Sequence, residues 1–260
     1  MLKGLYTAWT GMVNQQNRLD TMTNNLANAS TVGYKKEGTT SQSFDDILTV
    51  KIKDRSIGSQ RVVQPIGTNN PGVKIGENYT DFTQGSFRVT ENTYDLALAG
   101  EGFFALEFTN KAGETSTMYT RAGQFTLNSG GYLVNENGDY VLDVQNRRIR
   151  LDPLKDSVIS NNGTITQNET VVARIQVADF EDYNYLEKYG ESYYRPVEGA
   201  RLTQTSAEVK SGYLEMSNVQ VVSEMVDLIA ITRAYESNQK IIQTYDSSLE
   251  IAVTQLGRLQ

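Results

Sequence analysis

The N-terminal segment, over about residues 3–28, carries apolar residues at helical spacing. Seven positions are separated alternately by four and three residues: Leu5, Trp9, Met12, Gln16, Leu19, Thr23 and Leu26. This spacing places the seven side chains on one face of a helix in a heptad pattern. The leucines and Met12 take the d positions, and Trp9, Gln16 and Thr23 take the a positions. The sequence therefore predicts an N-terminal helix with a seam for a second helix.

A second heptad pattern covers about residues 218–259. Every seventh position is apolar or aromatic: Val221, Leu228, Tyr235, Ile242, Leu249 and Leu256. The paired a positions are predicted to be Met225, Thr232, Gln239, Asp246 and Val253. Ser217 and Asn218 precede this run and are predicted to cap the helix. A helix of this length would reach roughly 60 Å, which exceeds a typical small domain.

Neither helix is expected to be stable alone, because most helical stability comes from packing the apolar face. One interpretation is that the two ends pair only with each other as a hairpin. The other is packing between several chains. Polar residues at Thr232, Gln239 and Asp246 favour the second interpretation, because buried polar groups cost stability but can fix register and partner number.

The middle of the chain changes its period. A Ser-, Thr- and Gly-rich stretch follows Ala29, and short apolar runs alternate with Gly and Asn turns from about Tyr79 to Phe180. Strands are predicted at Asp95–Ala99, Phe103–Phe108, Gln124–Leu127, Tyr132–Val134 and Val171–Phe180, with hairpin turns at Asn135–Asp139 and Asn161–Gly163. The prediction is an α+β chain in four segments: an N-terminal helix (1–30), an extended connector (31–75), a mainly antiparallel β domain (76–210) and a C-terminal helix (211–260).

Composition narrows the function. The 260 residues include no cysteine and no histidine, so zinc sites built on those residues, thiol catalysis and His-dependent triads are excluded. The net charge of −7 argues against nucleic acid and anionic lipid as partners. No segment approaches the roughly 18 apolar residues of a membrane span, and residues 1–20 have no apolar signal-peptide core. We therefore expect neither membrane insertion nor a cleaved signal peptide.

Few residues suggest chemistry. Gly100-Glu101-Gly102 lacks the third glycine of a dinucleotide-binding loop and is predicted to be a turn. The adjacent carboxylates Asp45-Asp46 and Glu181-Asp182 are predicted to be solvated surface, because acid–base chemistry needs groups that face each other. No catalytic, cofactor or metal residue is predicted. The tyrosine-rich segment Tyr183–Pro196 is either a binding surface or a loop that packs on the β domain.

Four segments resemble a known family. The run from Asn24 to Lys35 resembles the N-terminal signature of flagellar basal-body rod and hook proteins. The segments Ser217–Val226 and Arg233–Asn238 resemble their C-terminal signature. Asp95–Phe104 and Tyr119–Gly123 are similar to central segments of the distal-rod branch, the FlgG and FlgF type. The resemblance extends over nearly the whole chain.

The resemblance implies a structural, non-enzymatic role in motility. It implies an axial subunit that polymerises through its terminal helices into a helical tube and transmits torque from motor to hook. Both termini would form an inner coiled-coil layer with the β domain outside it. The implied partners are other copies of the chain, other rod and hook proteins, and the flagellar type III export apparatus. The implied location is the basal body outside the cytoplasm, reached without a cleaved signal peptide.

The residues that we expect to mediate assembly lie on the two heptad faces and in the asparagine-rich motif. They are Leu5, Trp9, Met12, Leu19, Asn25, Leu26, Asn28, Val221, Met225, Leu228, Tyr235, Asn238, Ile242, Leu249 and Leu256. The alternatives are a hook-type axial protein, a cell-wall hydrolase that uses a carboxylate pair, and an adhesin that uses the tyrosine-rich segment. The last two leave the heptad faces unexplained.

Overall fold

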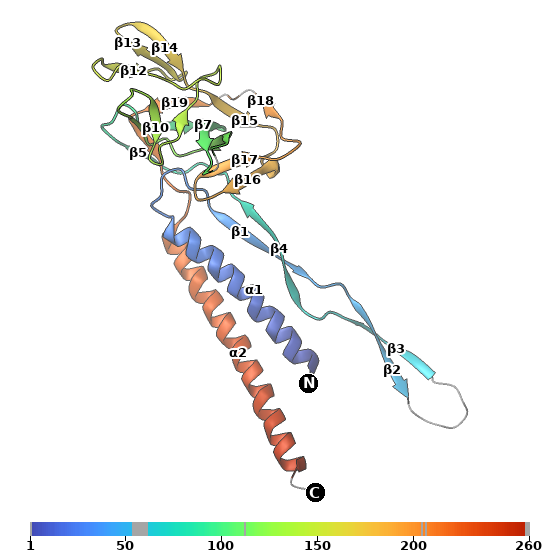
Figure 1. The fold of residues 1–260 in the computed structure, drawn as a ribbon. Helices are drawn as coiled ribbons and strands as arrows, with labels where there is room; N and C mark the ends of the chain where they lie inside the picture. The colour runs from blue at the N-terminus through green and yellow to red at the C-terminus, as the bar shows by residue number, and fades with distance from the viewer. Residues whose placement is uncertain (1, 54–61, 112, 204, 206, 258–260) are drawn as a thin grey trace. The chain divides into compact units, whose positions relative to one another are not determined.

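The structure is a computed structural model that describes residues 2–53, 62–111, 113–203, 205 and 207–257. It is an α+β chain with an N-terminal and a C-terminal helix and mainly antiparallel sheets (Figure 1). The helical elements are α1 (Leu2–Ala27), the 3₁₀ turn η1 (Tyr183–Tyr185) and α2 (Val221–Gly257). The strands are β1 (Glu37–Ser43), β2 (Ile47–Lys53), β3 (Val62–Asn69), β4 (Val73–Thr80), β5 (Phe87–Val89), β6 (Leu96–Ala99), β7 (Phe103–Thr109), β8 (Thr115–Thr120), β9 (Phe125–Leu127), β10 (Leu133–Asn135), β11 (Tyr140–Val141), β12 (Ser157–Ile159), β13 (Thr164–Gln167), β14 (Thr170–Arg174), β15 (Val177–Phe180), β16 (Leu186–Tyr189), β17 (Tyr193–Pro196), β18 (Leu202–Thr203), β19 (Glu208–Ser211) and β20 (Tyr213–Glu215).

The chain forms two compact units, and each combines segments that are distant in sequence. Unit 1 consists of residues 1–26, 37–79 and 221–260, and unit 2 of residues 27–36 and 80–220. In unit 1, α1 and α2 run antiparallel, and the strand pairs β1–β4 and β2–β3 form a long ribbon (Figure 1). The connector predicted at 31–75 is thus largely β-structure, with three of its strands in this ribbon.

The two helices pack along a seam that differs from the predicted one. On α2 the shielded positions are Glu224, Leu228, Ile231, Tyr235, Asn238, Ile242 and Tyr245. These positions again alternate by four and three, so the predicted d residues Leu228, Tyr235 and Ile242 do belong to the seam. Their partners lie one residue earlier than predicted: Gln239 and Asp246 are exposed, and Ile231 and Tyr245 take the seam.

Small residues of α1 receive the large side chains of α2. A Cβ atom added at Gly4 would lie 2.4 Å from the Tyr245 hydroxyl oxygen, and one at Gly11 would lie 3.1 Å from Asn238 Nδ2. Ala8, between these glycines, is buried. The predicted a residues of α1 do not share this seam, because Trp9, Gln16 and Thr23 are exposed.

A polar face of α1 packs against the ribbon. Asn25 Nδ2 donates to the Glu37 carbonyl oxygen (2.7 Å), and its Oδ1 accepts from the Glu37 amide (2.9 Å). One helical level away, Thr21 and Thr39 share a hydroxyl hydrogen bond of 3.0 Å. These contacts continue toward the N-terminus through Asn14–Ser41 and Thr7–Pro71. Because these side chains recur every three or four residues, α1 has a second, polar stripe beside its apolar seam.

Unit 2 is a β domain with two cores. A nine-stranded sheet has the order β16-β17-β8-β7-β11-β10-β9, with β15 paired to β7 and β18. Strand β7 is apolar throughout its first half because successive side chains point to opposite faces and both faces are buried. Phe104 and Leu106 enter the larger core, whereas Phe103 and Ala105 enter the second core with Tyr194.

Most local predictions for this unit are confirmed. The predicted strands before residue 135 are present within one or two residues, and the turns at Asn135–Asp139 and Asn161–Gly163 close the hairpins β10–β11 and β12–β13. The run predicted as one strand at Val171–Phe180 is two strands, β14 and β15. The predicted cap at Ser217 and Asn218 is wrong, because α2 begins only at Val221.

Candidate assembly surfaces

Three sequence motifs that are far apart along the chain meet in unit 2. Residues 33–36 follow α1 in sequence, residues 119–123 follow β8, and residues 215–218 precede α2. The Gly33 amide donates to the Glu215 carbonyl oxygen, and the Lys36 amide donates to Asn218 Oδ1, both at 2.8 Å. Asn218 therefore serves this junction instead of capping α2.

Gly33 illustrates why the motif needs its glycine. Its φ angle is +69°, in the left-handed region that favours glycine. A Cβ atom there would also lie 2.3 Å from the Ala122 backbone nitrogen. The motif residues Gly33 and Ala122 thus form a close backbone contact that a side chain would exclude.

A buried charge cluster lies at the centre of the junction. Lys35 Nζ lies 2.7 Å from Glu215 Oε1 and donates to the Thr83 carbonyl oxygen at 2.8 Å. Arg121 Nη1 lies 3.4 Å from Glu215 Oε2. All three side chains are almost completely buried. Sequence reasoning noted the motifs but missed this cluster, because no local pattern pairs Lys35 with a residue 180 positions away.

The electrostatics of the cluster follow from burial. Burial lowers the pKa of Lys35 below its usual value, and the charge and hydrogen bond of Glu215 act in the opposite direction. The Gly85 amide also donates to Glu215 Oε1 at 3.0 Å. The Arg121 guanidinium lies 5.3 Å from the centroid of the Phe103 ring, which links the cluster to the second core.

In unit 1, the first turns of α2 expose an apolar stripe. Val222, Met225, Val226 and Ile229 follow the spacing of one helical face, and Val222 and Val226 are 77% and 62% exposed. This face lies opposite the seam, because successive residues are 100° apart and Glu224, Leu228 and Ile231 point toward α1. This part of α2 is therefore apolar on one side and packed on the other.

The predicted assembly residues fall into three groups. Half-buried or buried within the chain are Leu5, Met12, Leu19, Asn25, Leu26, Asn28, Leu228, Tyr235, Asn238 and Ile242. Exposed are Trp9, Val221, Met225 and Leu249. The Leu256 side chain lies outside the described residues. Val222, Val226 and Ile229 were missed, because the heptad count followed the seam rather than the opposite face.

A groove lies at the other end of the helix pair. A cavity of about 340 Å³ is lined by Tyr6 and Lys3 of α1, by Pro71, and by ribbon residues Ile47, Thr49 and Asn69. Tyr6 and Trp9 are half-exposed, and their ring centroids are 5.8 Å apart. Apolar side chains with a rim of polar groups therefore surround this groove.

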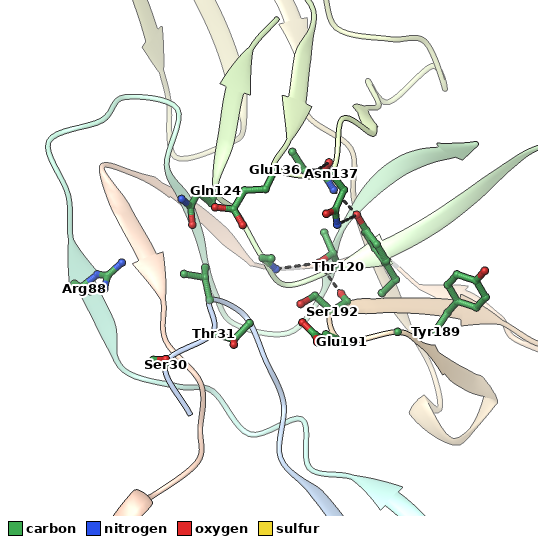
Figure 2. A pocket seen from close by; sticks show the side chains of 15 residues that line it. Ser30, Thr31, Arg88, Thr120, Gln124, Glu136, Asn137, Tyr189, Glu191 and Ser192 are labelled. Carbon is green, nitrogen blue, oxygen red and sulfur yellow. Dashed lines mark hydrogen bonds between the residues drawn. The ribbon is translucent and has the colours of Figure 1, made fainter. Parts of the chain in front are cut away.

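A larger pocket, of about 680 Å³, lies in unit 2 and is mainly polar (Figure 2). Its labelled side chains come from several segments, including Thr31, Glu136 and Glu191. The Thr120 hydroxyl donates to the Ser192 carbonyl oxygen at 2.7 Å, and Tyr193 accepts from Asn137 Nδ2 at 2.8 Å. These polar groups join the loops of the chain to each other.

The tyrosine-rich segment divides between the two predicted roles. Tyr194 is buried in the second core, and the Tyr183 ring packs 4.9 Å from the Phe82 ring. Tyr185 and Tyr189 are exposed. Both carboxylate pairs, Asp45-Asp46 and Glu181-Asp182, are exposed as expected.

Within the described residues, there is no group of three or more acidic side chains that could hold a metal ion. The same part of the chain holds no helix long and apolar enough to cross a membrane. The fold and surfaces define a class of protein: an α+β chain with paired terminal helices, an apolar helical face open to a partner, and a separate β domain.

Comparison with known proteins identifies the family. Residues 5–35 match the family described as flagella basal body rod protein, and residues 97–167 match the flagellar hook protein FlgE/F/G D1 domain. Residues 210–256 match the flagellar basal body rod FlgEFG protein C-terminal family.

Full-length relatives agree. The chain is 33% identical over 274 residues to the flagellar hook-basal body complex protein FlhO of Bacillus subtilis (strain 168), with 100% of each chain covered. It is 34% identical to the flagellar basal-body rod protein FlgF of Caulobacter vibrioides, again over 100% of each chain. It is 33% identical to the rod protein FlgG of Agrobacterium fabrum, over 96% of this chain and 98% of the relative. The chain belongs to the FlgE/F/G family of flagellar basal-body rod and hook proteins.

Proposed function

We propose that this chain is a structural axial subunit of the flagellar rod, which polymerises through its terminal helices into a helical tube and carries torque from motor to hook. The observation that carries the proposal is the apolar stripe Val222–Ile229, which lies opposite the intramolecular seam. A helix that is apolar on two opposite faces needs a partner on each. The first partner is α1, and the second is expected to be a neighbouring subunit. In the tube, α1 and α2 of successive subunits form an inner coiled-coil layer.

The same arrangement suits export. The subunit passes through the flagellar export apparatus without a cleaved signal peptide and reaches the basal body outside the cytoplasm. In unit 1, α1 is held to the ribbon by single polar contacts such as Thr21–Thr39 and Asn14–Ser41. Such contacts contribute about 0.5–1.5 kcal/mol each, so the terminal segments can unfold for passage and refold on docking.

The proposal is tested with Val226→Asp in the full chain. Val226 is largely exposed, so the change leaves the fold of unit 2 intact but places a charge in the subunit contact. Each ~1.4 kcal/mol of lost contact energy lowers the association constant about tenfold. We expect polymer, measured by sedimentation and electron microscopy, to be lost. Val226 is a sharper choice than Leu228, which also packs within the chain.

The matched control is Gln239→Asp, which adds the same charge to an exposed position of the same helix outside the stripe. It should polymerise like the unchanged chain. Equal polymerisation of Val226→Asp and Gln239→Asp would contradict assembly through the helical face.

A further inference from the structure

We propose that the apolar stripe on α2, Val222–Ile229, docks into the groove at the N-terminal end of unit 1 in a second copy of this chain. This inference rests on the proposed function and names the two surfaces that meet. The groove is bounded by Tyr6, Ile47 and Pro71, and the stripe offers Val222, Val226 and Ile229. A volume of about 340 Å³ accommodates a few aliphatic side chains.

The two surfaces lie at opposite ends of unit 1. Gly4 lies against Tyr245 and Gly11 against Asn238, which sets the antiparallel register of the helices. Continued by this register, residues 222–229 of α2 lie level with about residues 20–27 of α1. The groove lies level with residues 3–6. The separation is roughly 19 residues, or about 30 Å along the helix at 1.5 Å per residue.

This separation determines the kind of assembly. A stripe at one end and a groove at the other cannot satisfy each other within one copy. The contact between copies is therefore heterologous, and each added copy leaves one stripe and one groove open. Because the two surfaces are offset along the helices, repeated docking advances along the axis and produces an open filament.

Charge favours this pairing. Residues 221–232 of α2 contain two acidic residues, Glu224 and Asp227, and no basic residue. The groove contains Lys3, and the first turn of α1 carries no acidic residue. The acidic start of α2 thus approaches a basic, positively polarised helix terminus of its neighbour.

Disulfide cross-linking tests the contact directly, because the chain contains no cysteine. Full-length Val226→Cys and Ile47→Cys chains are mixed under polymerising conditions and oxidised. Because a disulfide needs Cα atoms within about 7 Å, the mixture should give about tenfold or more cross-linked dimer compared with either variant alone. A second mixture, Met225→Cys with Thr49→Cys, gives the same readout if Val226→Cys disturbs the helix.

The control mixture is Val226→Cys with Leu154→Cys, since Leu154 of unit 2 is 96% exposed and lies outside both surfaces. Polymer that forms without the Val226–Ile47 and Met225–Thr49 cross-links overturns the docking inference and leaves the proposed function in place. Preferential cross-linking to Leu154→Cys also overturns it, because the stripe then faces the β unit of the neighbour. Failure of the unmodified chain to polymerise overturns both proposals.

Discussion

At the scale of single residues, Glu215 has the most demanding environment. Its carboxylate accepts from Lys35 and from the Gly85 amide and faces Arg121, with no exposure to solvent. A buried ion pair contributes little net stability compared with a well-packed apolar pair, but removing one partner leaves an uncompensated charge. The cluster therefore acts mainly by fixing which three segments meet.

Glu215→Gln should destabilise unit 2 by about 3–5 kcal/mol, because the amide keeps the shape of the side chain but leaves Lys35 and Arg121 without their counter-charge. Urea unfolding followed by near-ultraviolet circular dichroism measures the change. Glu208→Gln, at an exposed position of β19, is the control and should change stability by about 0.5 kcal/mol or less. Similar stabilities for the two variants would show that the cluster is dispensable.

Tyr193 provides a prediction for alkaline pH. Its hydroxyl donates to Asp139 Oδ2 at 2.5 Å, and burial, supported by Asp139, raises its pKa from 10.0 to about 12. The folded state thus keeps a proton that the unfolded state has lost. The stability gained from this proton is fully present below about pH 10 and is lost as the pH rises to about 12.

Tyr193→Phe should therefore make the stability of unit 2 fall less steeply between about pH 10 and pH 12. The pKa of Tyr183 is also raised by burial and by Asp179, so part of the alkaline loss should remain. Unfolding midpoints measured across this pH range check the prediction. An unchanged slope in Tyr193→Phe would show that Tyr193 does not hold its proton in the folded state.

At the scale of elements, α1 is held by two different kinds of surface. One face brings Gly4, Ala8 and Gly11 close to α2, and the other hydrogen-bonds to the ribbon. Asn25, with 1% of its surface exposed, occupies both backbone groups of Glu37 in the manner of a neighbouring strand. The asparagine that resembles part of a bundle interface is thus already used within the chain.

Asn25→Ala should cost about 1–3 kcal/mol of local stability, because it leaves the Glu37 amide and carbonyl without this partner. Hydrogen exchange at the Glu37 amide should become faster by the corresponding factor. Asn24→Ala, at the exposed neighbouring position, is the control. Equal exchange in both variants would mean that Asn25 does not hold β1 to the helix.

At the scale of the whole molecule, the two units differ in how completely they bury apolar surface. Unit 2 closes two cores around β7. Unit 1 leaves apolar side chains exposed on α2 and the ribbon, among them Val222, Ile66 and Leu48. We therefore expect the stability of unit 1, but not that of unit 2, to depend on the presence of other subunits.

Thermal unfolding at several protein concentrations tests this expectation. The chain has one tryptophan, Trp9 in α1, so its fluorescence reports on unit 1. The Trp9 transition should move to higher temperature as the concentration rises, because association stabilises the folded helices. The tyrosine signal of unit 2 should keep the same midpoint. A single transition that is independent of concentration would contradict the proposed coupling of helix folding to assembly.

The sequence by itself determined the elements of this protein. Heptad spacing located α1 within one residue at each end, and Gly and Asn turns located the hairpins β10–β11 and β12–β13. These features depend on neighbours a few positions away, so a local pattern contains them. The family followed from the same local motifs.

Only the tertiary structure decided which faces those elements use. Periodicity marked a stripe on α2, but the choice of Ile231 over Thr232 as the seam residue depends on the small side chains of α1 that face it. In the same way, Lys35, Arg121 and Glu215 form one cluster only because the β unit brings three distant segments together. Contacts between residues far apart in the chain are set by packing and burial, which no local spacing specifies.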